Sequence, residues 1–154
     1  MQIFCKKNTC LTIWLILGGS ALFSCYALYM TEADVIAHWR KGAQDALEAA
    51  ELLHRGKKYA LALFNLHLAV EKALKAQYME ECRKEAPPTH DLFLIAKTLT
   101  YPWTAEQERQ LGYLTEYAIA SRYDDPHWAE HEATQENSTL WLSIAKEFLS
   151  SLLP

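Results

Sequence analysis

The chain has 154 residues, 51% of them hydrophobic, and a formal net charge of −4. An acidic chain is a poor non-specific ligand for nucleic acid, because affinity for phosphate backbones comes from clustered Lys and Arg. The sequence also contains no glycine-rich loop of the kind that cradles phosphates. Any contact with RNA or a nucleotide is therefore expected to be local.

The first 29 residues differ in composition from the rest. Lys6 and Lys7 precede an apolar run from Leu11 to Met30 that contains no charged residue. A run of about twenty such residues can cross a bilayer as a helix, and a short basic region before an apolar stretch also fits a signal peptide. If the run is a membrane anchor, the two lysines favour a cytoplasmic location for its N-terminus, and the remainder of the chain would then lie outside the cell.

The alternative is that translation starts at Met30 and that residues 1–29 are upstream sequence. Thr31-Glu32-Ala33-Asp34 follows Met30 at once and has the pattern of a capping box that opens a helix. Only Cys82 lies beyond the leader, so no internal disulfide can form there, which fits a reducing compartment. We expect an apolar leader at 1–29 and one domain at 30–154. If translation starts at Met30, the protein is expected in the cytoplasm. Otherwise it is expected to be anchored in the membrane through Leu11 to Met30.

The domain has the periodicity of helices throughout. Proline and glycine interrupt that periodicity at Gly56, Pro87-Pro88 and Asp125-Pro126, and Thr89 is expected to cap a short helix that ends near Leu99. The sequence therefore predicts an all-α domain, an antiparallel bundle of four main helices plus a short helix, preceded by the N-terminal apolar segment. Apolar residues recur at helical spacing over 31–54, 58–83, 104–123 and 133–152.

The apolar stripes of the last two long helices also predict part of the core. A stripe with helical spacing faces the interior, whereas the polar residues between its members face solvent. The residues expected inside are Leu111, Leu114, Ala118, Ile119, Leu140, Trp141, Ile144, Phe148 and Leu152.

Three motifs carry a resemblance to a known family. The run AVEKALKA, from Ala69 to Ala76, is followed in order by Thr89-His90-Asp91-Leu92 and Ser121-Arg122-Tyr123. Together they resemble the HEPN family, which comprises small helical domains linked to nucleotide and RNA chemistry, over about Met30 to Leu153. The resemblance implies a nucleotide-binding or partner-docking module that forms a homodimer and pairs with a minimal nucleotidyltransferase in a toxin–antitoxin-like system. It implies no cofactor.

The charged residues of the first motif have two interpretations. Glu71 and Lys75 are four residues apart in the favourable order, and a solvated surface pair of this kind contributes about 0.2–0.5 kcal/mol. In the functional interpretation, Lys72 and Lys75 present ammonium groups to a nucleotide phosphate, and Glu71 and His90 belong to the same nucleotide-binding or partner-binding set. For His90 the alternative is a side chain that hydrogen-bonds at a helix start.

Arg122 and His127 suggest an alternative function. Ribonuclease members of the family carry Arg, then four to six residues, then His, near the end of the third main helix, and Arg122 and His127 match that spacing. Arg holds a phosphate as a planar fork and His transfers protons near neutral pH, so the pair would make a metal-independent endoribonuclease toxin. The other interpretation is a helix-end Arg that pairs with Asp124 or Asp125.

No metal site is predicted. His127 and His131 are four residues apart with Glu130 between them, but the acid does not occupy its place in the His-Glu-x-x-His zinc pattern. The toxin subclass that a nucleotidyltransferase regulates often has Tyr two residues after the motif His, and this chain has Ala129 there. The sequence therefore departs from that subclass at the position that is modified.

Overall fold

The computed structural model describes residues 31–123 and 126–153, and all regular structure in these two ranges is helical. The body consists of four long helices, α1 (Glu32–Arg55), α2 (Tyr59–Cys82), α4 (Ala105–Tyr123) and α6 (Gln135–Leu152). Two short helices accompany them, α3 (Leu92–Ala96) and α5 (Pro126–His131). The predicted all-α bundle of four main helices is confirmed, and α5 is a second short helix.

The apolar leader and Asp125 lie outside the described residues. Within the part of the chain that is described, no helix is both long enough and apolar enough to span a bilayer.

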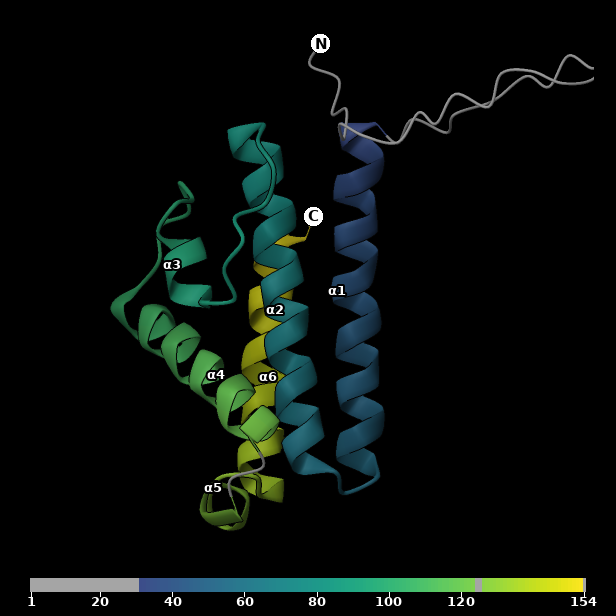
Figure 1. Ribbon diagram of the computed structural model, residues 1–154, viewed down its shortest axis with the longest axis vertical. Helices are drawn as coiled ribbons and strands as arrows, with labels where there is room; N and C mark the ends of the chain where they lie inside the picture. Colours follow the sequence, from purple (N-terminus) through teal and green to yellow (C-terminus); the bar gives the residue numbers. More distant parts are fainter. Residues whose placement is uncertain (1–30, 124–125, 154) are drawn as a thin grey trace, which may run out of the picture.

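Helix α2 lies at the centre of the bundle. Helix α1 runs along one side of it, α6 packs against it from behind, and α4 crosses it on the other side (Figure 1). Helix α3 contacts both α2 and α4, and α5 lies beyond the C-terminal end of α4 (Figure 1). Because α2 has neighbours on several sides, it buries residues around much of its circumference, among them the polar His67, Glu71 and Lys75.

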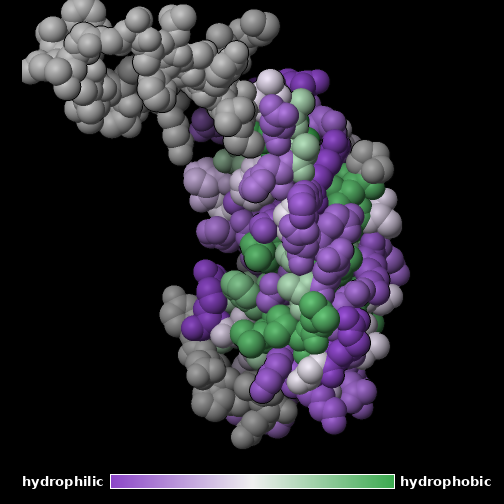
Figure 2. All heavy atoms as spheres, turned by 90° about the vertical axis from the view of Figure 1, so that its right-hand side faces the viewer, coloured by the Kyte–Doolittle hydropathy of each residue, from purple (hydrophilic) through white to green (hydrophobic). Residues whose placement is uncertain are grey.

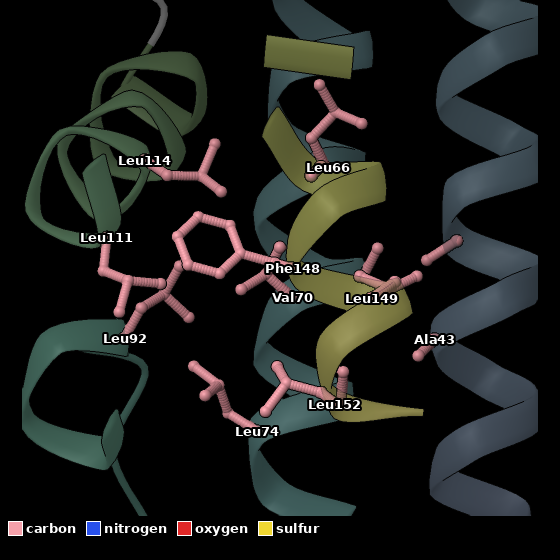
Figure 3. Packing of buried hydrophobic residues seen from close by; sticks show 14 of the residues in the cluster. Ala43, Leu66, Val70, Leu74, Leu92, Leu111, Leu114, Phe148, Leu149 and Leu152 are labelled. Carbon is pink, nitrogen blue, oxygen red and sulfur yellow. The ribbon is translucent and has the colours of Figure 1, made fainter. Parts of the chain in front are cut away.

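Apolar side chains from α2, α3, α4 and α6 form one core. Phe148 reaches from α6 toward α3 and α4, where Leu92, Leu111 and Leu114 lie around its ring (Figure 3). Burial of each such side chain contributes about 1.5–3 kcal/mol. The prediction that Ile119 and Leu140 lie inside is wrong, since they are 46% and 54% exposed. Ile144 is half-buried, and the other residues expected inside are buried: Leu111, Leu114, Ala118, Trp141, Phe148 and Leu152.

Local capping explains where the long helices begin. Thr31 Oγ1 accepts a hydrogen bond from Asp34 N at 3.1 Å, and Asp34 Oδ2 accepts one from Thr31 N at 2.8 Å. Thr104 and Gln107 form the same reciprocal pair at 3.0 and 3.2 Å at the start of α4. Both capping boxes satisfy backbone N–H groups that a helix start leaves unpaired, so both predicted starts are confirmed. The predicted end of α1 at Gly56 is confirmed as well.

Two helices begin later than the sequence predicts. Asp91, not Thr89, caps α3: Asp91 Oδ1 accepts from Leu94 N at 3.0 Å, while Thr89 Oγ1 accepts from Asp91 N at 3.1 Å. The helix α3 then ends at Ala96, whose carbonyl accepts from Trp103 Nε1 at 3.0 Å. Helix α6 begins at Gln135 because Thr134 serves as its N-cap, with Oγ1 accepting from Asn137 N at 3.2 Å.

The face of the molecule that α1 covers is mostly hydrophilic. Hydrophobic residues gather in its lower half, toward the end where α1 joins α2 (Figure 2). Leu52 of α1 and Leu61 of α2 are 62% and 51% exposed. Apolar residues that cluster on a surface are typical of protein contacts.

Candidate ligand site on helix α2

Three polar side chains form one row on α2. His67, Glu71 and Lys75 follow each other at intervals of four residues, so they lie above one another on the same side of the helix. Their residues are 4%, 4% and 6% exposed. The interpretation of Glu71 and Lys75 as a solvated surface pair is therefore wrong, because α1 and the segment before α3 cover this side of α2.

The Glu71 carboxylate is the centre of the row. Lys75 Nζ donates to Glu71 Oε1 at 2.7 Å, and His90 Nδ1 lies 3.0 and 3.1 Å from the two carboxylate oxygens. Lys75 Nζ also lies 5.6 Å from the centroid of the Trp39 ring on α1. A buried ion pair costs desolvation energy, which these additional contacts offset. The pair is thus part of the packing between helices as well as of the polar cluster.

His90 connects the buried row to the surface. Its side chain is 67% exposed, although Nδ1 contacts a carboxylate that is 6% exposed. His67 Nε2 lies 2.9 Å from the carbonyl oxygen of His90, and since a carbonyl only accepts, the His67 ring must donate from Nε2. Both the ring and the backbone of His90 are therefore fixed against α2.

His67 is held in its neutral form. Burial lowers the pKa of His67 below its ordinary value of 6.5, and the electrostatic influence of His90 and Arg122 lowers it further. The hydrogen bond to the His90 carbonyl and the charge of Glu71 oppose this shift but do not reverse it. With Nε2 protonated in the neutral ring, the unprotonated Nδ1 lies 3.8 Å from Glu71 Oε2.

Arg122 lies near the C-terminal end of α4, and its charge contributes to the lowered pKa of His67. Its Nε donates to the carbonyl of Ala118 at 3.1 Å, and its side chain is exposed. A helix C-terminus favours a cation, because the last carbonyl groups carry partial negative charge. The cluster therefore has an exposed group, His90, above a buried base of His67, Glu71 and Lys75, and Arg122 is exposed near the end of α4.

His127 belongs to the next element. It is the second residue of α5, it is exposed, and its ring lies against that of His131 in a tilted arrangement, with the centroids 4.6 Å apart. Helix α5 begins at Pro126, and the proposed Asp124 and Asp125 partners of Arg122 lie outside the described residues. Over residues 31–123 and 126–153, no three His, Cys, Asp or Glu side chains converge as a metal site would require.

Lys72 is separate from the row that contains Lys75. Its Nζ lies 3.3 Å from the carbonyl oxygen of Gly42, and the two residues line a small pocket with His38 and Trp39. The sequence grouped Lys72 with Lys75 as two ammonium groups presented to a phosphate. The structure instead places Lys75 against Glu71 and Trp39, and Lys72 against α1.

Sequence reasoning did not assign a role to His67 or Trp39. The spacing of His67 four residues before Glu71 is the one signal that could have found it, because such residues are neighbours on a helix. Nothing in the sequence places Trp39 over Lys75, since that contact depends on how α1 packs on α2.

The fold and the cluster define a small helical-bundle domain with a partly buried, titratable site. The HEPN domain model matches residues 36–153, so the chain belongs to the HEPN domain family. Among solved structures the chain is similar to TT1696 from Thermus thermophilus, with a TM-score of 0.67 and 24% identity over 76% of this chain and 94% of that chain. This similarity shows the fold alone. The comparison with curated proteins gave no match.

Proposed function

We propose that this HEPN domain is a binding module for a nucleotide or an RNA end, and that the cluster around Glu71 is its site. The observation that carries the proposal is the pairing of an exposed His90 ring with a buried carboxylate. Buried polar networks that support exposed groups are the way proteins hold ligand contacts in place. Arg122 supplies the planar donor that phosphate recognition uses.

The local charge supports an anionic ligand in spite of the acidic chain. Lys75 neutralises Glu71 within the buried row, so the exposed His90 ring has no unpaired carboxylate beneath it. Steering by the whole chain is weak at a net charge of −4, so binding should depend on these few contacts. The proposal therefore predicts that a single substitution of Arg122 removes most of the affinity.

The test is calorimetric titration of the protein with nucleoside monophosphates and with a short single-stranded RNA. Arg122→Ala should weaken binding at least tenfold, which corresponds to about 1.4 kcal/mol. Arg109→Ala is the matched control, because Arg109 is an exposed arginine of the same helix that pairs with Glu106. Equal loss in both variants, or none in either, would contradict the proposed site.

A metal-independent endoribonuclease is the second candidate function. It is favoured by one observation: Arg122 near the end of α4 and His127 at the start of α5 are both exposed, on the two sides of the short break between these helices. Arg122 would hold the scissile phosphate and His127 would transfer a proton. Assignment of Arg122 and His127 as a catalytic pair stays a prediction.

We also propose a homodimer that docks a minimal nucleotidyltransferase, as in toxin–antitoxin-like pairs. The support is the hydrophobic area on the face that α1 covers (Figure 2), together with the exposure of Leu52 on α1 and of Leu61 on α2, since exposed apolar surface favours protein contacts. Sedimentation of the protein alone should show a dimer, and addition of a nucleotidyltransferase encoded beside it should give a larger complex. A monomer that ignores the added enzyme would contradict both parts of the proposal.

A further inference from the structure

Two lysines of α2 differ in how their charge is balanced. Among the lysines that the structure describes, Lys72 and Lys75 are the two that are not exposed. Lys75 pairs with the Glu71 carboxylate at 2.7 Å. Within the described part of the chain, Lys72 makes no ion pair, and its hydrogen bond goes to the carbonyl oxygen of Gly42. A half-buried cation without a counter-charge is costly, so Lys72 is suited to an anion from outside the domain.

The Gly42 carbonyl is a weak partner for this ammonium group. Gly42 lies inside α1, where its carbonyl oxygen also accepts a hydrogen bond of the helix. Lys72 Nζ lies 3.3 Å from that oxygen, whereas N–H···O bonds are usually about 2.9–3.0 Å long. An ammonium group has three donors. Most of the hydrogen-bonding capacity of Lys72 therefore remains for a ligand.

Lys72 lines a pocket between α1 and α2. The pocket has a volume of about 140 Å³, and its other lining residues are His38, Trp39 and Gly42. Gly42 keeps the space open, because a Cβ there would lie 3.1 Å from Lys72 Nζ. The Trp39 ring supplies an apolar wall, and it packs against a buried apolar cluster of the same two helices. Since a cavity of about 150 Å³ holds benzene, this pocket suits a ligand with one small ring or a short chain.

The donors around the pocket select a monoanion. Helix α1 is continuous from Glu32 to Arg55, so the backbone N–H groups beside Gly42 are bonded within the helix and cannot bind an anion. Phosphate sites commonly use such N–H groups or the guanidinium fork of an arginine. Lys72 is the one lining residue with a permanent charge. Its single positive charge is balanced by the single negative charge of a carboxylate.

We propose that this pocket binds a small organic monocarboxylate, whose carboxylate pairs with Lys72 and whose apolar part lies against the Trp39 ring. The ligand supplies a counter-charge to Lys72 and covers apolar surface of the indole. The pocket is a second site, separate from the cluster around Glu71, and it requires no nucleotide. A chain with a net charge of −4 does not attract anions in general, so binding depends on these local contacts.

The experiment titrates the full chain with benzoate and with benzamide, which has the same shape without the charge. Nitrogen–proton correlation spectra follow the Trp39 indole N–H and the Gly42 backbone N–H. Benzoate should shift both signals with a dissociation constant of about 1 mM, which its small size allows. Benzamide should bind at least about tenfold more weakly, because it cannot balance the ammonium charge. Equal binding of the two compounds would overturn the proposal.

A variant removes the charge from the pocket. Lys72→Met keeps an unbranched side chain and should weaken benzoate binding at least about tenfold. Lys41→Met is the matched control, because Lys41 is an exposed lysine of α1 that already pairs with Asp45. The control should change the affinity less than about twofold. An equal loss in the two variants would show diffuse attraction to surface lysines and would overturn the site.

Two further measurements test the ligand class and the place of the site. Inorganic phosphate should bind at least about tenfold more weakly than benzoate, because it has no apolar part to cover the indole. Phosphate that bound as tightly would overturn the choice of a carboxylate. His90→Phe should leave benzoate binding unchanged, and a loss there would overturn the separation from the nucleotide site. If benzoate up to about 50 mM shifted neither the Trp39 nor the Gly42 signal, the pocket would not be a carboxylate site, even if Lys72→Met failed to fold.

Discussion

Lys75 Nζ lies 2.7 Å from Glu71 Oε1, and the side chains of the two residues are only 7% and 6% exposed. Their spacing is that of a common surface pair, but their surroundings are those of a core. Removal of one partner from a buried pair leaves the other charge uncompensated, which costs far more than the loss of a surface pair. The structure therefore contradicts the expectation that Glu71 and Lys75 form a solvated surface pair that contributes little to stability.

We therefore expect Lys75→Ala to lower the free energy of unfolding by about 3–5 kcal/mol, measured by urea denaturation. The matched control is Lys41→Ala. It breaks the ion pair between Lys41 and Asp45, which has the same spacing in the sequence and a similar length of 2.8 Å, but whose side chains are both exposed. This control should leave the midpoint of urea denaturation nearly unchanged. A double variant, Glu71→Gln with Lys75→Met, should recover much of the lost stability. An equally small effect in Lys75→Ala and Lys41→Ala would show that the pair is solvated.

The sequence predicted the helices well because their ends are set by neighbours in the chain. Thr31 with Asp34 and Thr104 with Gln107 need only a short segment to form a capping box, and Gly56 needs no distant partner to end α1. The short helix α3 was less predictable, because Thr89 and Asp91 are both good caps. Asp91 caps the helix, and Thr89 supports the Asp91 backbone instead.

The site was predicted only in part because burial on α2 depends on other elements. A stripe pattern assumes one buried side, whereas α2 packs on α1, α3, α4 and α6. The small residues Ala69, Ala73 and Ala76 are fully buried and allow neighbouring elements to come close. The motifs grouped Glu71 with His90, and these two residues are in contact. They also predicted that Lys75 faces solvent, whereas its side chain is buried.

The buried His67 makes stability depend on pH. Its pKa is lowered in the folded protein by burial first and then by the electrostatic influence of His90 and Arg122, while in the unfolded chain it stays near 6.5. Below that pH the unfolded state takes up a proton that the folded state does not, so the free energy of unfolding falls as pH falls. The loss is at most about 1.4 kcal/mol per pH unit.

His67→Gln should reduce the pH dependence of the free energy of unfolding, because glutamine can donate to the His90 carbonyl without titrating. The effect should be seen between about pH 7.5 and about pH 5.5, which lie on either side of the ordinary histidine pKa. Urea midpoints at the two pH values measure the effect. His38→Gln serves as the control, since His38 is exposed on α1. If His67→Gln lost as much stability on acidification as the wild-type protein, another group would have to be responsible.

Two glycines inside helices should respond differently to alanine. A Cβ at Gly112 in α4 would meet nothing within 4 Å, so Gly112→Ala should stabilise the protein by about 0.5–1 kcal/mol through helix propensity. A Cβ at Gly42 would lie 3.1 Å from Lys72 Nζ and 3.2 Å from its Cδ. Gly42→Ala should therefore gain less, because the lysine must move. Thermal unfolding of both variants measures the difference, and a larger gain at Gly42 would contradict the contact with Lys72.

The ribonuclease hypothesis makes a prediction about metal and about two residues. Cleavage of single-stranded RNA, if the chain performs it, should survive EDTA, since Arg122 and His127 would act through phosphate binding and proton transfer alone. His127→Ala should reduce the rate by about 10²–10⁴-fold, the usual contribution of a general acid–base group, and Arg122→Ala by about 10²–10³-fold, the usual cost of losing one donor to the transition-state charge. His131→Ala is the matched control, because the His131 ring contacts that of His127 and is exposed on the same helix. Activity that EDTA abolishes, or that survives in His127→Ala, would remove this function. The binding module would then remain, with Arg122 as a phosphate contact and His127 outside the site.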